Sequence, residues 1–188
     1  LQLGTNHLGH FALTAHLLPL LRRTPGARVV VVSSGAHHMG HIDFADLNFE
    51  GRGYSPWRAY AQSKLANLLF ALELQRRLRA AGAAVLVTAA HPGWTATDLQ
   101  RTAGAARFFN PYFAMKPADG ALPTLRAATD PAASAGEYFG PSRFFEMNGP
   151  PERARLSRNA RDESVAARLW TTSETLTGVR YGLPAGAA

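Results

Sequence analysis

The chain has 188 residues, of which 46% are hydrophobic and 18% are charged, and it contains no cysteine. This composition predicts one globular domain with a sizeable core, and it excludes disulfides, thiolate metal sites and cysteine nucleophiles. The net charge of +7 would suit a nucleic-acid partner, but the arginines are scattered, without a basic run or an interleaved aromatic patch, so we expect no nucleic-acid binding.

The first half of the chain predicts a helix, a strand, a long helix and a second strand. Apolar residues recur at helical spacing in residues 1–23, although Pro19 should kink or shorten that helix. The apolar run "ARVVVVSS" predicts a parallel strand that is buried on both faces. After a Gly- and His-rich loop at residues 35–55, Ser55 is expected to cap a helix that runs to about Arg79. The run "AAVLVTAAHPG" predicts the second buried strand.

The second half predicts mainly helices. We expect them at about 97–106, 117–129 and 161–176, with a last short strand in "GEYFG" at 136–140. Helices that alternate with apolar strands favour an α/β fold with a mainly parallel sheet. Residues 1–188 should therefore form a single domain.

The segment "YAQSK" places Tyr60 and Lys64 four residues apart in the long predicted helix. Positions i and i+4 lie on one face of a helix, so both side chains can reach the same site. An ammonium beside a phenol favours the phenolate, which prepares the tyrosine to give or take a proton. Lys64 and Lys116 are the only lysines among 20 basic residues, and a compact ammonium suits this role better than a guanidinium. The alternative interpretation is a chance pair on an exposed helix.

Four motifs, in this order along the chain, resemble the second half of a short-chain dehydrogenase/reductase. Within that superfamily they are most similar to the retinol-dehydrogenase-like, or WW-domain-oxidoreductase-like, group. The resemblance covers roughly residues 1–130 closely and the remainder loosely, and it implies a Rossmann-like, doubly wound parallel sheet. The motifs are "TNHLGHFALT", "RVVVVSSGAHH", "YAQSKLAN" and "HPGWTATD".

The resemblance implies a catalytic tetrad and an NADP or NAD cofactor, with NADP slightly favoured. Asn6 would hold a water that links Lys64 to solvent, and Ser34, the second serine of "VVSS", would position the substrate oxygen. Tyr60 would be the general acid/base during hydride transfer between the nicotinamide and an alcohol, aldehyde or ketone. Lys64 would bind the nicotinamide ribose beside Tyr60. Further cofactor contacts are implied for Ser33, Pro92, Gly93, Trp94, Thr95 and Thr97.

The family's usual domain begins with a strand, a Gly-rich turn and a helix that cradle the pyrophosphate. None of these occurs in this sequence, so the resemblance implies that the N-terminal nucleotide-binding half, roughly 100 residues, is missing. Residues 1–100 would then be the catalytic half, and residues 101–188 the substrate loop and C-terminal region. The alternative hypothesis is an inactive remnant that binds no cofactor and acts at most as an association module. Half a sheet would expose apolar surface, so we expect marginal stability.

Several other side chains allow two interpretations. The seven histidines lack the spacing and the cysteine partners of a zinc site, so we expect no metal. Trp57 and Tyr54 would line a substrate entrance or pack the start of the helix. An aromatic cluster and the segment "RFFEMNG" at 143–149 would form a lipophilic substrate pocket or ordinary core. The cluster comprises Phe108, Phe109, Tyr112 and Phe113.

Composition and resemblance also predict where the protein acts and how it assembles. No stretch approaches the roughly 20 apolar residues of a membrane span. The absence of thiols fits a reducing compartment, so we expect a cytoplasmic protein. The resemblance leaves the oligomeric state open; in a homo-oligomer, the predicted helices 1–23 and 56–79 would form the contact. The substrate and the direction of the reaction stay open.

Overall fold

A computed structural model describes residues 1–94 and 115–185, and it has the alternation of helices and strands that the sequence predicts. The sheet has four strands in the order β1-β2-β3-β4. The strands β1 (Arg28–Val32), β2 (Leu86–Ala90) and β3 (Tyr138–Arg143) are parallel, and β4 (Asn148–Arg153) is antiparallel to β3. The predicted α/β, Rossmann-like fold with a mainly parallel sheet is therefore confirmed.

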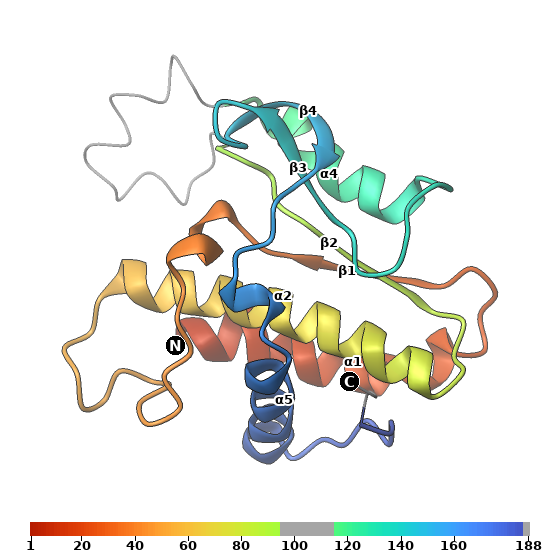
Figure 1. Cartoon of the computed structure of the whole chain (residues 1–188). Coiled ribbons are helices and arrows are strands. Elements are labelled where there is room, and N and C mark those ends of the chain that lie inside the picture. Colours follow the sequence, from red (N-terminus) through yellow and green to blue (C-terminus); the bar gives the residue numbers. More distant parts are fainter. Residues whose placement is uncertain (95–114, 186–188) are drawn as a thin grey trace.

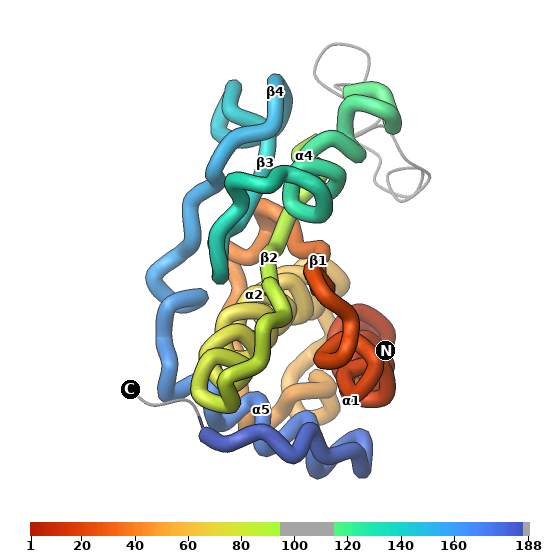
Figure 2. Tube along the Cα trace, turned by 90° about the vertical axis from the view of Figure 1, so that its right-hand side faces the viewer, coloured from red at the N-terminus to blue at the C-terminus, as the bar shows by residue number. Residues whose placement is uncertain are grey.

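Helices cover both faces of this sheet (Figure 1). On one face lies α4 (Pro117–Thr129), and on the other lies α2 (Pro56–Ala80) with α1 (Gly9–Leu21) beside it. The C-terminal helix α5 (Glu163–Thr177) forms a further layer that packs against α2 and α1 on the side away from the sheet (Figure 2). The long helix α2 is thus enclosed between the sheet and α5.

Local chemistry sets the length of α2. The Ser55 hydroxyl accepts a hydrogen bond from the Arg58 N–H, and Pro56 occupies the first turn, where its missing N–H costs nothing. The helix stops just before Gly82, whose φ of 63° suits glycine. Leucines on several sides of α2 are buried because neighbours cover the helix nearly all round.

An aromatic cluster joins α5 to the helices beneath the sheet. The Phe11 ring lies 5.2 Å from the Trp170 ring and 4.8 Å from the Tyr181 ring. The Tyr181 hydroxyl donates to the Phe11 carbonyl at 2.6 Å. Nearby, a hydrogen bond of 2.8 Å joins His7 Nε2 to the Ser173 hydroxyl. The C-terminal segment is therefore part of the core.

Three predictions about the elements need correction. The β1 strand is not buried on both faces: only Val31 is buried, and Val32 is 42% exposed, because β1 is an edge strand of this sheet. The strand at "GEYFG" is not the last, since β4 follows it and tolerates prolines as an edge strand. The first helix opens with a π-helical turn, η1 (Gly4–Leu8), and α1 ends at Leu21 rather than residue 23.

Some predictions fall outside the residues that the structure describes. These are the helix at about 97–106, the cofactor contacts of Thr95 and Thr97, and the aromatic cluster of Phe108, Phe109, Tyr112 and Phe113.

Candidate active site

Three elements carry the predicted tetrad to the carboxyl end of β1. That end of a parallel sheet is where open α/β folds bind ligands. The Lys64 ammonium donates to the carbonyl of Val32, the last residue of β1, at 3.4 Å, and the Asn67 amide donates to the same oxygen at 3.0 Å. Asn6 donates to the Ser63 hydroxyl at 3.0 Å. The three elements are η1 with Asn6, the chain after β1 with Ser34, and α2 with Tyr60 and Lys64.

Tyr60 and Lys64 lie one turn apart, with Lys64 Nζ 5.6 Å from the centroid of the Tyr60 ring. Both side chains are half-buried. Burial lowers the pKa of the Lys64 ammonium below its ordinary value, because removal from water disfavours the charged form. A positive charge that is partly removed from water interacts more strongly with a nearby phenol. The pair therefore has the arrangement that its sequence spacing predicts.

The two serines after β1 point in different directions. Ser33 is buried, and its hydroxyl donates to the Lys64 carbonyl at 2.8 Å, so it packs β1 against α2. Ser34 is half-buried, accepts a hydrogen bond from the Ala36 N–H at 3.2 Å and lines an open cavity. Successive residues of an extended chain alternate between faces, which explains the difference. The structure thus makes Ser34 the accessible serine of the two.

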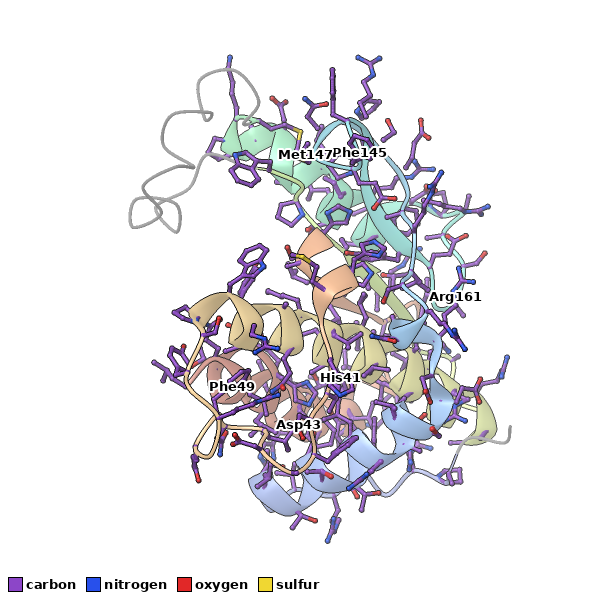
Figure 3. The ribbon with its side chains drawn as sticks, turned by 60° about the vertical axis from the view of Figure 1, so that its left-hand side comes forward. His41, Asp43, Phe49, Phe145, Met147 and Arg161 are labelled. Carbon is purple, nitrogen blue, oxygen red and sulfur yellow. The ribbon has the colours of Figure 1, made fainter. Side chains whose placement is uncertain are left out.

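The cavity beside Ser34 has a volume of about 810 Å³. Its apolar wall includes Met39, Trp57, Trp94, Phe145 and Met147, and its polar wall includes His91 and Glu146. Figure 3 shows Phe145 and Met147 on the turn between β3 and β4. Trp57 and part of the segment 143–149 therefore line a pocket, which is one of the two interpretations open for each. Among the described residues, Tyr60 and Lys64 do not line this cavity, but the Trp57 ring lies 5.9 Å from the Tyr60 ring.

The predicted cofactor residues Pro92, Gly93 and Trp94 form a turn directly after β2. Gly93 has a φ of 67°, and a β-carbon there would collide with the Met147 carbonyl and the Pro141 ring. Only glycine fits this position without strain. The Trp94 N–H donates to the Met147 carbonyl at 2.7 Å. Gly93 and Trp94 form part of the wall of the same cavity as Ser34.

His37 supports Ser34 from behind, a role that the sequence analysis did not assign. His37 Nε2 accepts from the Ser157 N–H at 3.2 Å, so Nδ1 carries the proton that meets the Ser34 carbonyl at 2.8 Å. The ring is buried, and burial lowers the pKa of His37 to about 4, which keeps it neutral. The motif "AHH" after the two serines was the only local sign of a histidine near Ser34. The contact of His37 with Ser157 could not be predicted, because the two residues are distant in sequence.

The described residues offer neither a metal site nor a membrane span. Among residues 1–94 and 115–185, no group of three or more His, Asp or Glu side chains is arranged to hold a metal ion. Within the same ranges, none of the helices combines the length and the apolar character needed to cross a bilayer.

A family model described as short chain dehydrogenase matches residues 2–107. The chain belongs to the short-chain dehydrogenase family. The matched stretch contains Asn6, Ser34, Tyr60 and Lys64, and the resemblance noted in the sequence is confirmed.

The similar proteins of this family include retinol and polyprenol dehydrogenases. Human (Homo sapiens) retinol dehydrogenase 13 is 40% identical over 95% of this chain and 54% of its own length. Mouse (Mus musculus) polyprenol dehydrogenase is 42% identical over 100% of this chain and 56% of its own length. The chain thus spans about half the length of the curated relatives it matches, and its motifs place it in the retinol-dehydrogenase-like group.

Solved structures agree with this assignment. An uncharacterised protein from Mycobacterium paratuberculosis is 47% identical, with a TM-score of 0.78 over 96% of this chain and 60% of its own. A short-chain dehydrogenase from Shigella flexneri, complexed with NADP, is 26% identical, with a TM-score of 0.52 over 71% of this chain and 48% of its own.

Proposed function

We propose that this chain is the catalytic part of an NAD(P)-dependent oxidoreductase that transfers a hydride between a nicotinamide and an alcohol or carbonyl compound. The observation that carries this proposal is the Tyr60–Lys64 pair, whose ammonium donates to the Val32 carbonyl at the carboxyl end of β1, two residues before Ser34. Membership of an oxidoreductase family supports it.

The described residues fit a nicotinamide cofactor at two places. The Lys64 ammonium has three donors and gives one to Val32, which leaves donors for the hydroxyls of a ribose. Gly93 and Trp94 form part of the wall of the cavity beside Ser34, where a nicotinamide would lie against them. The bound cofactor would supply the hydride chemistry. We propose NADP, which the family resemblance favours and which accompanies the Shigella flexneri relative.

Side chains of the protein would transfer the proton to and from the substrate oxygen. During reduction of a carbonyl, the Ser34 hydroxyl donates a hydrogen bond that orients the substrate oxygen. Tyr60 gives its phenolic proton to that oxygen as the carbon accepts the hydride, so an alcohol and a phenolate result. The Lys64 ammonium stabilises this phenolate, and Asn6 would hold the water that returns a proton. Oxidation of an alcohol uses the same groups in reverse.

The substrate that we propose is lipophilic. Five apolar side chains, from Met39 to Met147, line the cavity next to Ser34. Pockets of this size and character suit apolar small molecules with few polar anchors. The relatives' names, retinol dehydrogenase and polyprenol dehydrogenase, point to alcohols with long apolar chains. A long-chain aldehyde is therefore the first substrate to test.

The test is turnover of reduced nicotinamide cofactor by the purified chain, with aldehydes of increasing chain length. We expect Tyr60→Phe to lower kcat by about 10²- to 10⁴-fold, the usual contribution of general acid catalysis, with little change in cofactor affinity. Tyr54→Phe is the matched control, because Tyr54 is an exposed tyrosine six residues earlier. Full turnover by Tyr60→Phe would refute the assigned role.

The alternative, an association module without activity, is favoured by a different observation. On α1 the leucines Leu13, Leu17 and Leu20 are exposed and form one apolar stripe, whereas α5 covers α2. If the chain neither binds cofactor nor turns over substrate, association through this stripe becomes the better proposal. A homo-oligomer built through α1 is compatible with either function.

A further inference from the structure

The turn between β3 and β4 has an unfavourable backbone. Phe144, Phe145 and Glu146 have φ values of 48°, 56° and 63°, so three consecutive non-glycine residues adopt the left-handed conformation. The Met147 N–H closes the turn by donating to the Arg143 and Phe144 carbonyls, each at 3.1 Å. Such a backbone persists only where surrounding contacts hold it, and it is often found at functional sites. We refer to residues 144–147 as the left-handed turn.

The Glu146 carboxylate fastens the left-handed turn to the interior. One oxygen accepts from the Arg155 N–H at 2.9 Å, and the other lies 3.3 Å from His91 Nε2. The latter contact is too poorly aligned for a hydrogen bond, so it is an electrostatic contact. Burial raises the pKa of Glu146, but the His91 and Arg155 contacts outweigh burial and lower it below its ordinary value, so the carboxylate is charged.

The His91 ring contacts the segment after β2, the left-handed turn and β3. Its Nδ1 accepts from the Gly93 N–H at 3.3 Å, so in the neutral ring the proton lies on Nε2, facing Glu146. The ring is buried against Gly140, where a β-carbon would collide with it. The ring of Tyr138, which lies on β3 like Gly140, is 5.1 Å from the His91 ring. A small displacement of His91 would therefore move the residues that surround it.

Two links join the left-handed turn to the turn after β2. One is the hydrogen bond of 2.7 Å from the Trp94 N–H to the Met147 carbonyl, and the other runs from Glu146 through His91 to the Gly93 N–H. Both turns line the cavity that Ser34 also lines. The position of Gly93 and Trp94 relative to Ser34 therefore depends on the left-handed turn.

We propose that Glu146 is a positioning residue that acts through His91 to fix Gly93 and Trp94 in the wall of the cavity. The left-handed turn, the contact between Glu146 and His91, and the buried His91 ring form one connected path to Gly93. The importance of this path for a nicotinamide rests on the proposed function, while the path itself is independent of it. Glu146 would thus set the geometry of the cofactor turn without touching the reacting atoms.

The test is backbone amide hydrogen exchange, measured by NMR on the purified chain. In Glu146→Ala we expect exchange at Gly93 and Trp94 to accelerate about tenfold, while buried amides such as that of Leu69 keep their rates. In Glu146→Gln the amide oxygen can still accept from Arg155, so acceleration should stay below about threefold. The matched control is Glu152→Ala, since Glu152 lines the same cavity from β4.

A second measurement follows the His91 ring nitrogens in ¹⁵N-labelled protein, assigned through their loss in His91→Gln. We expect the proton on Nε2 in the wild type and in Glu146→Gln. If Glu146→Ala fails to fold, the tautomer of His91 in Glu146→Gln is the remaining test: a proton on Nε2 supports the proposed path, and a proton on Nδ1 contradicts it.

The proposal would be overturned by unchanged exchange at Gly93 and Trp94 in Glu146→Ala, by equal acceleration in Glu152→Ala, or by a proton on Nδ1 of His91. Acceleration throughout the core would also overturn it, since that would show a general structural role. Neither measurement needs cofactor or turnover. Failure here would leave the proposed function standing, and failure of the Tyr60 test would leave the positioning role standing.

Discussion

The enclosed helix α2 and its neighbour α1 carry similar leucines in very different surroundings. On α2, Leu65, Leu68 and Leu69 are at most 1% exposed, whereas Leu13 and Leu17 of α1 are 55% and 44% exposed. The difference comes from neighbours, because α2 lies between the sheet and α5, while no described element covers the outward face of α1. An apolar pattern therefore predicts a helix, but its neighbours decide how much of its surface is buried.

The candidate active site lies where these two regions meet. Asn6 belongs to the helical segment that leads into α1, while Tyr60 and Lys64 belong to α2. Ser34 follows β1, an edge strand of this sheet. The four residues of the candidate site thus come from both the open and the enclosed region, so changes in either region test how the two regions are coupled.

The largest expected effect is on the face of α1 that packs against α2 and α5. Phe11→Ala should lower the free energy of unfolding by about 4 kcal/mol, because it removes a fully buried ring from the aromatic cluster and leaves a cavity. Leu13→Ala, on the same helix but exposed, should change it by less than about 0.5 kcal/mol. Urea unfolding of both variants gives the comparison. Similar losses for the two would mean that the exposed face of α1 is covered in solution.

The pH dependence of stability should come from two buried histidines, His7 in η1 and His37 in the segment after β1. Burial lowers the pKa values of His7 and His37 from 6.5 to about 4, so between these values the unfolded chain binds protons that the folded chain does not. Each histidine then makes its full contribution above pH 6.5, and at pH 5 about 2 kcal/mol per histidine should be lost.

Urea unfolding at pH 7 and pH 5 measures this loss, and His7→Gln isolates one histidine. In His7→Gln, the decrease in the free energy of unfolding that comes from the two histidines should be about half of that in the wild type. The acidic groups contribute equally to both proteins, so they cancel in this comparison. The same pH dependence in His7→Gln and wild type would show that His7 is not buried in the neutral form.

The smallest effect on stability is expected in the open region. Leu17→Gln should change the free energy of unfolding by less than about 0.5 kcal/mol, because the side chain is already largely in water. It should nevertheless reduce self-association, since it interrupts the exposed apolar stripe of α1. Sedimentation velocity over a range of concentrations detects this change. Unaltered association would place the contact elsewhere on the chain.

Much of the architecture could be predicted from local sequence. Ser55, Pro56 and Gly82 set the ends of α2, and the expected bounds of α4 match the structure. The spacing of Tyr60 and Lys64 could be predicted because one turn of a helix brings such positions together. The preference for Ser34 over Ser33 agrees with the alternation of side chains along an extended chain. These features depend on neighbours within a few residues.

The tertiary structure decided the remainder. Nothing in "NGPPER" has the pattern of a strand, and β4 forms because β3 offers it a partner. The strand β1 reads as buried, yet its place at the edge leaves Val32 exposed. His37 meets Ser157, and His91 meets Glu146, across distances in sequence that no local pattern spans. The sequence by itself determined which segments of the first half are helical or extended and that Tyr60 and Lys64 share one face of α2, because these follow from side-chain period and capping. The packing of distant segments determined burial, tautomer and charge, because these depend on the groups that the fold brings into contact.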